Sequence, residues 1–124
     1  MPPLFSIVIP AHNEEKYIRK TLQSIKLQTY RDFETIVVAN GCTDKTEEIV
    51  KKRANKDLRL LSLPKANVSV ARNAGALNAN GNILVFVDAD TTLEADSLKK
   101  IKDEFTQEYA VATTMVKPDL KKAK

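Results

Sequence analysis

The sequence is poor in several residue types, and each shortage excludes a class of protein. It has one cysteine, Cys42, so no internal disulfide can form, which fits a reducing compartment. It has only three glycines, and neither the GxGxxG pattern of dinucleotide-binding proteins nor the GxxxxGK[ST] pattern of P-loop proteins occurs. Aromatic residues make up 6% and are not interleaved with basic residues, as base-stacking proteins require. We therefore expect no nucleic-acid partner.

Long apolar runs are also lacking. No run approaches the roughly 20 residues that cross a bilayer, and the first residues show neither a basic segment nor a signal-cleavage site. We expect a cytoplasmic protein whose membrane contact is at most peripheral, at the inner face. The net charge of +4 indicates either solvated helix faces or contact with phosphate-bearing ligands or an anionic membrane. The basic excess comes from Lys51, Lys52, Arg53, Lys99, Lys100, Lys102, Lys117, Lys121, Lys122 and Lys124.

Strand-like and helix-like segments alternate along the 124 residues, a length that suits one domain. Such alternation predicts an α/β fold of three layers, with a mostly parallel sheet between helices. The domain is expected over residues 1–116, followed by a basic tail, 117–124. The predicted strands are 5–9, 33–39, 58–63, 82–87 and 109–116, and the predicted helices are 14–28, 43 or 44 to 54, 67–79 and 93–107.

Polar residues at the starts of these segments predict helix caps. Asn13 is expected to cap the first helix, and Thr43 or Asp44 the second. Glu47 stands where the acid of a capping box belongs. Asn80 and Gly81 form the stop signal of the third helix.

Turn-forming and polar residues also follow the predicted strands. The carboxyl ends of parallel strands share one edge of a sheet, and ligands of open α/β sheets bind at that edge where the strand order reverses. The sequence therefore predicts a ligand site there. The loops concerned are 10–15, 40–44, 64–65 and 88–91.

Asp88 and Asp90 end an apolar run that reads as a buried strand. Desolvating a carboxylate is costly unless it is paired, protonated or bound to a metal. Carboxylate oxygens are ligands for hard cations such as Mg²⁺ or Mn²⁺. The alternative is that Asp90 or Thr91 caps the next helix and Asp88 merely leaves the sheet.

Taken together, the motifs resemble the nucleotide-binding, N-terminal half of the inverting glycosyltransferases of family 2. The resemblance covers roughly residues 5–116 and implies a truncated, Rossmann-like GT-A fold. The matching motifs are SIVIPAHNEE, TLQSIKLQTY, FETIVVANGCTDKT and VARNAGALNANGNILVFVDAD.

The resemblance implies a function: transfer of a sugar, with inversion, from a nucleoside diphosphate to an unknown acceptor. The loop after the first strand would enclose the base, and Arg72 would approach the base or the phosphates. Asp88 and Asp90 match the DXD motif, which holds Mg²⁺ or Mn²⁺ against the diphosphate. The implied nucleotide-binding residues are Pro10, Ala11, His12, Asn13, Glu14, Asn40, Arg72, Asp88 and Ala89.

The sequence departs from the family pattern at several places. Ala39 and Asn40 stand where two aspartates are frequent, which leaves the donor base open. His12 replaces a tyrosine, and the alternative reading is a loop histidine without a catalytic task. Cys42 replaces a serine and is expected to be a packed residue rather than a nucleophile. Asp44 is retained, with helix capping as its expected role.

No carboxylate after Asp90 has a matching motif, so no general base is identified. Three hypotheses follow. The chain is a glycosyltransferase whose acceptor half lies outside it or comes from a partner; it is a truncated, non-catalytic nucleotide-binding module; or it is an interaction domain that forms a homodimer through an exposed sheet edge.

Overall fold

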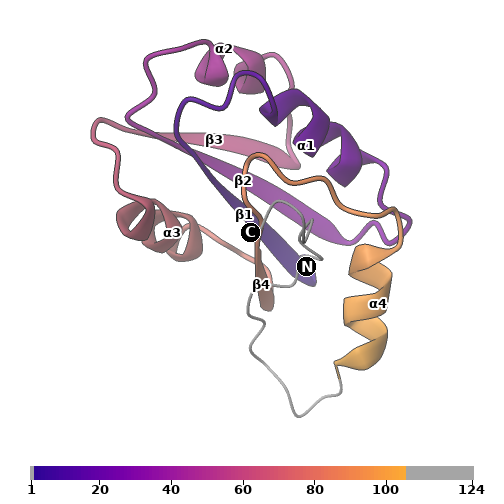
Figure 1. The fold of residues 1–124 in the computed structure, drawn as a ribbon. Helices are drawn as coiled ribbons and strands as arrows, with labels where there is room; N and C mark the ends of the chain where they lie inside the picture. The colour runs from indigo at the N-terminus through magenta and orange to yellow at the C-terminus, as the bar shows by residue number, and fades with distance from the viewer. Residues whose placement is uncertain (1, 106–124) are drawn as a thin grey trace.

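The computed structural model describes residues 2–105, which form a four-stranded parallel sheet with helices on both faces (Figure 1). The strand order is β3-β2-β1-β4. This is the predicted Rossmann-like GT-A type of sheet. The predicted strand 109–116 and the tail 117–124 lie outside the described residues. The elements are β1 (Phe5–Ala11), α1 (Ile18–Lys26), β2 (Phe33–Asn40), α2 (Thr46–Lys51), β3 (Leu58–Leu63), α3 (Val68–Leu77), β4 (Ile83–Phe86) and α4 (Ser97–Glu104).

The centre of the sheet is β1, which pairs in parallel with β2 on one side and β4 on the other. Its first residue, Phe5, lies opposite Phe33 and Ile83. Nearly all of β1 and β2 is buried, because helices cover both faces of the sheet. Sustained apolar runs are typical of strands in this position. Between residues 2 and 105, no helix is long and apolar enough to cross a membrane.

Successive side chains of β1 enter two separate cores. Phe5, Ile7 and Ile9 pack in the core that α1, α2 and α4 cover. Val8 packs on the opposite face with Ala71 of α3, and Figure 1 shows α3 on the other side of the sheet from α1. α3 packs closely on the sheet at Gly75, where an added Cβ would clash with a Val8 methyl group.

The first helix begins later than predicted. α1 starts at Ile18 instead of residue 14, and Asn13 is not its N-cap. Asn13 has a left-handed φ of 51°, and its side-chain oxygen accepts hydrogen bonds from the main-chain N–H groups of Thr43 (2.8 Å) and Asp44 (3.2 Å). A contact with a loop thirty residues away has therefore replaced the local cap.

The second helix starts at Thr46, so the N-cap predicted at Thr43 or Asp44 is also wrong. Asp44 still serves the helix start, because its Oδ1 accepts from the Thr46 N–H at 2.9 Å. Glu47 forms no capping box and instead accepts from the hydroxyl of Ser62 at 2.6 Å.

The last two helices also differ from their predicted ranges. α3 lies within the predicted 67–79, with the side chain of Asn67 capping it through the Val70 N–H at 3.1 Å. α4 begins at Ser97 rather than residue 93. The main-chain N–H of Leu93 donates to the hydroxyl of Ser24 instead, so this stretch packs along α1 before the helix starts.

The strand order reverses between β1 and β4. The chain leaves β1 toward β2 on one side, whereas β4 joins the other side of β1. In open parallel sheets, ligands bind beyond the carboxyl ends of the strands at such a point. The loops after β1 and β4 therefore mark the place for a site.

Candidate functional site

The loops after β1 and β2 are bonded to one another at the carboxyl end of the sheet, which we call the carboxyl edge. His12 Nδ1 lies 2.8 Å from the carbonyl oxygen of Asn40, and the N–H of Glu14 donates to the hydroxyl of Thr46 at 2.8 Å. The N–H of Glu15 donates to Asp44 Oδ2 at 3.2 Å. The predicted meeting of these loops is confirmed.

The partner of His12 fixes which ring nitrogen carries the proton. A carbonyl oxygen only accepts, so Nδ1 is the donor and Nε2 is the unprotonated nitrogen of the neutral ring. His12 is exposed. In its neutral form the ring therefore offers a hydrogen-bond acceptor at the carboxyl edge, in an orientation that the bond to Asn40 holds.

Asn40, predicted to bind the nucleotide, is only 3% exposed and links three segments. Its side-chain Nδ2 donates to the carbonyl of Ala11 at 3.1 Å, and its Oδ1 accepts from the N–H of Asn67 at 3.0 Å. The next residue, Gly41, has a φ of +66° and donates to the carbonyl of Leu63 at 2.9 Å. Asn40 thus joins the ends of β1 and β2 to the start of α3.

The two aspartates flank a turn directly after β4. The turn is closed by a hydrogen bond from the Thr91 N–H to the Asp88 carbonyl at 3.1 Å. Ala89 and Thr91 are buried, whereas Asp88 is exposed and Asp90 is partly exposed. The alternative that Asp90 or Thr91 caps α4 is wrong, because the N-cap of α4 is Asp96.

The donor set at this turn fits a small divalent cation. Mg²⁺ commonly binds one or two protein carboxylates and completes its shell with phosphate oxygens and water. Asp88 and Asp90 supply two carboxylates one residue apart. Within the part of the chain that the structure describes, no three His, Cys, Asp or Glu side chains are grouped to hold a metal. The turn therefore suits a cation that arrives with a phosphate ligand.

The remaining predicted residues lie at different depths. The side chains of Ala11 and Ala89 are buried, so only their main chains can face a ligand. Pro10 and Glu14 are partly exposed. Arg72 is exposed on α3, the helix on the opposite face of the sheet from α1, and takes no part in the hydrogen bonds described above between the loops.

Cys42 and Asp44 lie in the same loop, but their pKa values are shifted in opposite directions. Burial raises the pKa of the Cys42 thiol, whose Sγ lies 3.3 Å from the Ala11 carbonyl. A raised pKa keeps the thiol protonated, as expected for a packed residue. Burial also acts to raise the pKa of Asp44, but hydrogen bonds from Thr46 and Glu15 outweigh it and leave this pKa lowered.

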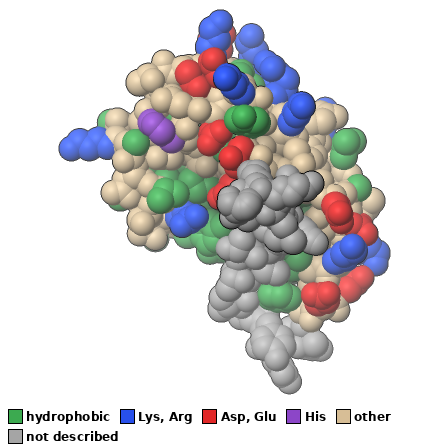
Figure 2. All heavy atoms as spheres, in the orientation of Figure 1, with side chains coloured by type: hydrophobic (Ala, Val, Ile, Leu, Met, Phe, Trp, Pro, Cys, Tyr) green, Lys and Arg blue, Asp and Glu red, His purple; other side chains and the backbone are tan. Residues whose placement is uncertain are grey.

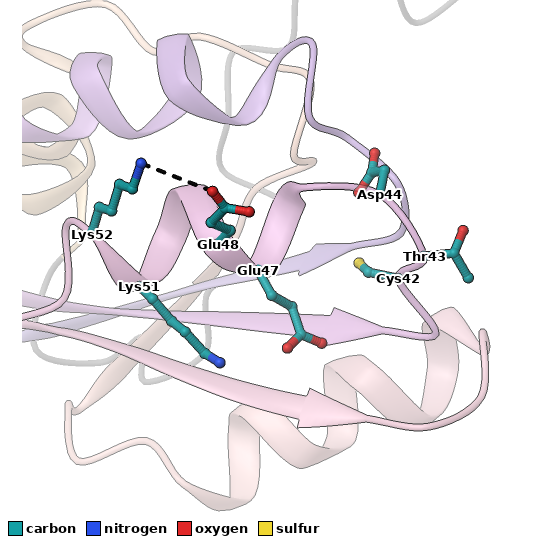
Figure 3. A pocket seen from close by; sticks show the side chains of 7 residues that line it. All are labelled: Cys42, Thr43, Asp44, Glu47, Glu48, Lys51 and Lys52. Carbon is teal, nitrogen blue, oxygen red and sulfur yellow. Dashed lines mark ion pairs between the residues drawn. The ribbon is translucent and has the colours of Figure 1, made fainter.

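A shallow hollow of about 550 Å³ lies along α2, and neither Asp88 nor Asp90 lines it (Figure 3). Glu48 and Lys52 form an exposed ion pair of 3.9 Å on its rim. Figure 2 shows basic side chains gathered over α2 at the top of the view. The mixture of both charges gives the hollow no single ligand class. Its lining residues are Cys42, Thr43, Asp44, Glu47, Glu48, Lys51 and Lys52.

Sequence reasoning missed the side chains of α1 that hold the aspartate turn. The hydroxyl of Thr21 donates to the carbonyl of Ala89, between the two aspartates, at 2.7 Å. A signal was present: Thr21, Ser24 and Gln28 are polar residues at helical spacing on the buried side of the helix.

Comparisons with known proteins agree with this geometry. Residues 6–122 match the family model described as Glycosyl transferase family 2. A Streptococcus pneumoniae protein named glycosyltransferase GlyA is 37% identical over 107 residues, which are 85% of this chain and 15% of that protein. The chain spans 15%, 32% and 46% of three curated relatives that it matches, less than half of each.

Solved structures share the fold. Staphylococcus aureus TarS in complex with UDP-GlcNAc superposes with a TM-score of 0.75 at 33% identity, over 81% of this chain and 30% of that chain. A mannosyltransferase from Pyrobaculum calidifontis in complex with GDP-Man and Mn²⁺ gives a TM-score of 0.72 at 28% identity, over 79% of this chain and 31% of that chain.

Proposed function

The chain belongs to glycosyl transferase family 2, and we propose that it binds the nucleoside-diphosphate sugar of an inverting sugar transfer through a divalent cation on Asp88 and Asp90. One observation carries this proposal. Both aspartates flank one hydrogen-bonded turn, at the carboxyl end of β4, where the strand order reverses. The relatives bound to UDP-GlcNAc and to GDP-Man with Mn²⁺ support it.

We propose that Asp88 and Asp90 hold Mg²⁺ or Mn²⁺ against the diphosphate of the donor. A bound cation supplies Lewis-acid stabilisation of the charge that develops on the leaving diphosphate. The two carboxylates orient the diphosphate at the end of β4, and the buried Ala89 between them keeps the turn anchored in the core.

The donor base is proposed to lie against the loop after β1, made of Pro10, Ala11, His12, Asn13 and Glu14. His12 presents an acceptor nitrogen there, because its Nδ1–H is bonded to Asn40. Asn40 acts by holding this loop, and Arg72 is proposed to approach the base or the phosphates from α3. No aspartate stands at positions 39 and 40, so the base is recognised without a carboxylate at these two positions.

The acceptor site is proposed to lie outside residues 2–105, in a further part of the protein or in a partner. The chain spans less than half of its curated relatives, and an inverting transfer needs a base to take the proton of the attacking hydroxyl. Sugar transfer to an acceptor by this chain alone would contradict this part of the proposal.

Calorimetry tests donor binding. The wild-type chain is titrated with UDP and with GDP, each with and without Mn²⁺, and then the Asp88→Asn and Asp90→Asn variants. We expect Mn²⁺ to tighten binding of one nucleotide, and each variant to lose at least about tenfold in affinity, or ~1.4 kcal/mol, with Mn²⁺ present.

Asp57→Asn is the matched control, since Asp57 is an exposed aspartate just before β3, at the other end of the sheet. Its affinity should equal that of the wild type. The proposal fails if neither nucleotide binds more tightly with Mn²⁺, or if all three variants behave alike.

A further inference from the structure

A polar stripe runs along the buried side of α1 and just past its end. Thr21 is 0% exposed and Gln28 is 2% exposed, and Ser24 between them is partly buried. Spacings of three and four residues place all three on one side of a helix. Burying polar groups among Ile18 and Leu22 is unfavourable unless every group finds a partner. The stripe therefore needs partners inside the fold.

Ser24 and Gln28 bond carbonyls of α1 and also the main chain that follows the aspartate turn. Ser24 Oγ accepts from the N–H of Leu93 at 3.0 Å. Gln28 donates from Nε2 to the carbonyl of Glu94 at 2.7 Å and accepts at Oε1 from the N–H of Leu98 at 3.0 Å. The stripe thus holds this segment against α1 along its length, up to the start of α4.

Thr21 holds the turn itself. Its hydroxyl donates to the Ala89 carbonyl at 2.7 Å, and this carbonyl belongs to the peptide that joins Ala89 to Asp90. The same turn is closed by the Thr91 N–H on the Asp88 carbonyl. Fixing that peptide fixes the direction in which the main chain enters Asp90. Packing alone would be served by a valine, which has nearly the same shape as threonine. What the threonine adds is a hydroxyl that donates to the Ala89 carbonyl and so satisfies a buried polar group.

We propose that Thr21 is a positioning residue for the divalent cation: through the Ala89 carbonyl it sets the placement of the Asp88 and Asp90 carboxylates. This inference rests on the proposed function, because it assigns a task to Thr21 only if the two aspartates bind a cation. Groups that hold a metal ligand in place commonly change metal affinity by about 10- to 100-fold when removed.

The test compares two variants at Thr21 with one at the opposite end of the sheet. Thr21→Val removes the hydroxyl and keeps the shape, and Thr21→Ser keeps the hydroxyl. Ser6→Ala is the control, since Ser6 is equally buried and its hydroxyl bonds Glu34 at 2.5 Å, away from the turn. Electron paramagnetic resonance of Mn²⁺ with UDP or GDP present measures cation binding directly.

We expect Thr21→Val to weaken Mn²⁺ binding about tenfold. Thr21→Ser should bind Mn²⁺ as the wild type does. Ser6→Ala should lower the unfolding midpoint of the protein without changing its Mn²⁺ affinity. The proposal is overturned if Thr21→Val binds as the wild type does, or if Ser6→Ala weakens binding equally. If Thr21→Val does not fold, Thr21→Ala, which also removes the donor to the Ala89 carbonyl, is measured in its place. We expect the same loss, and an unchanged Mn²⁺ affinity would overturn the proposal.

Amide hydrogen exchange separates this inference from the proposed function. A wild-type chain that binds no Mn²⁺ with either nucleotide contradicts the proposed function and, with it, the task assigned to Thr21. If the wild type does bind, Thr21→Val should speed exchange at the Thr91 amide while the Gly81 amide, which donates to Ser6 Oγ at 2.7 Å, stays protected. Unchanged exchange at Thr91 would overturn the positioning on its own.

Discussion

The two ends of the sheet both carry carboxylates, but their surroundings are opposite. At the end where the strands begin, the buried carboxylate of Glu34 accepts from the Ser6 hydroxyl (2.5 Å), the Arg59 guanidinium (2.6 Å) and the Asn80 N–H (2.6 Å). We call these four residues the amino-edge network. At the carboxyl edge, the side chain of Asp88 is exposed. Its main-chain carbonyl is held instead, by a hydrogen bond from the Thr91 N–H.

This difference separates a structural carboxylate from one available to a ligand. Glu34 is 6% exposed and surrounded by donors from three other segments, so its acceptor sites are used inside the fold. Burial acts to raise the pKa of Glu34, but the hydrogen bonds from Asn80, Ser6 and Arg59 outweigh it and leave this pKa lowered. A carboxylate that serves a ligand needs the reverse: a fixed backbone and a side chain that faces solvent.

Breaking the amino-edge network gives the largest expected loss of stability. Glu34→Ala leaves the Arg59 guanidinium and two other donors without their acceptor, which should lower the free energy of unfolding by about 3 kcal/mol. Urea denaturation measures it. At a temperature where the variant is folded, its Mn²⁺ binding should match the wild type. A loss of binding would show that the two ends are not independent.

Asn40→Asp tests the carboxyl edge, where an aspartate would match the family pattern. One oxygen can still accept from the Asn67 N–H, but the other would face the Ala11 carbonyl, to which Asn40 now donates. We expect a loss of about 2 kcal/mol at neutral pH, shrinking in acid as the carboxyl gains a proton to donate. Asn82→Asp at an exposed position is the control. An equally stable Asn40→Asp variant would contradict the linking role of Asn40.

The smallest expected effect is a pH dependence at the amino edge. The folded-state pKa of Glu34 is lowered, so its contribution is present above the unfolded pKa of about 4.3 and is lost as the pH falls through the folded value. The stability difference between the wild type and Glu34→Gln should therefore narrow in acid. Urea denaturation at neutral and acidic pH measures it. A difference that widens in acid would contradict the lowered pKa.

Much of the fold and the place of the site could be predicted from local patterns. The apolar runs of β1 and β2 indicate strands covered on both faces, and the alternation with helices indicates a parallel sheet. Parallel strands bring their following loops to one edge, so the position of Asp88 and Asp90 at the carboxyl edge follows from the order of the elements. These predictions depend on periodicity and chain order, which a sequence contains directly.

Helix boundaries and the true roles of polar side chains could not be predicted in this way. α1 starts at Ile18 because the N–H groups of Glu14 and Glu15 donate to Thr46 and Asp44, some thirty residues along the chain. Asn13 reads as a cap but bonds the loop after β2.

The sequence by itself therefore determined the parallel sheet, the edge where the loops meet and the pair of aspartates at the end of β4. Only the tertiary structure decided which polar residues serve the fold. Glu34 and Asn40 are enclosed by donors and acceptors from distant segments, whereas Thr21 reaches the peptide between the two aspartates from a helix 68 residues away in sequence. A hydrogen bond satisfies a buried polar group regardless of sequence distance, so its partner is fixed only when the chain has packed.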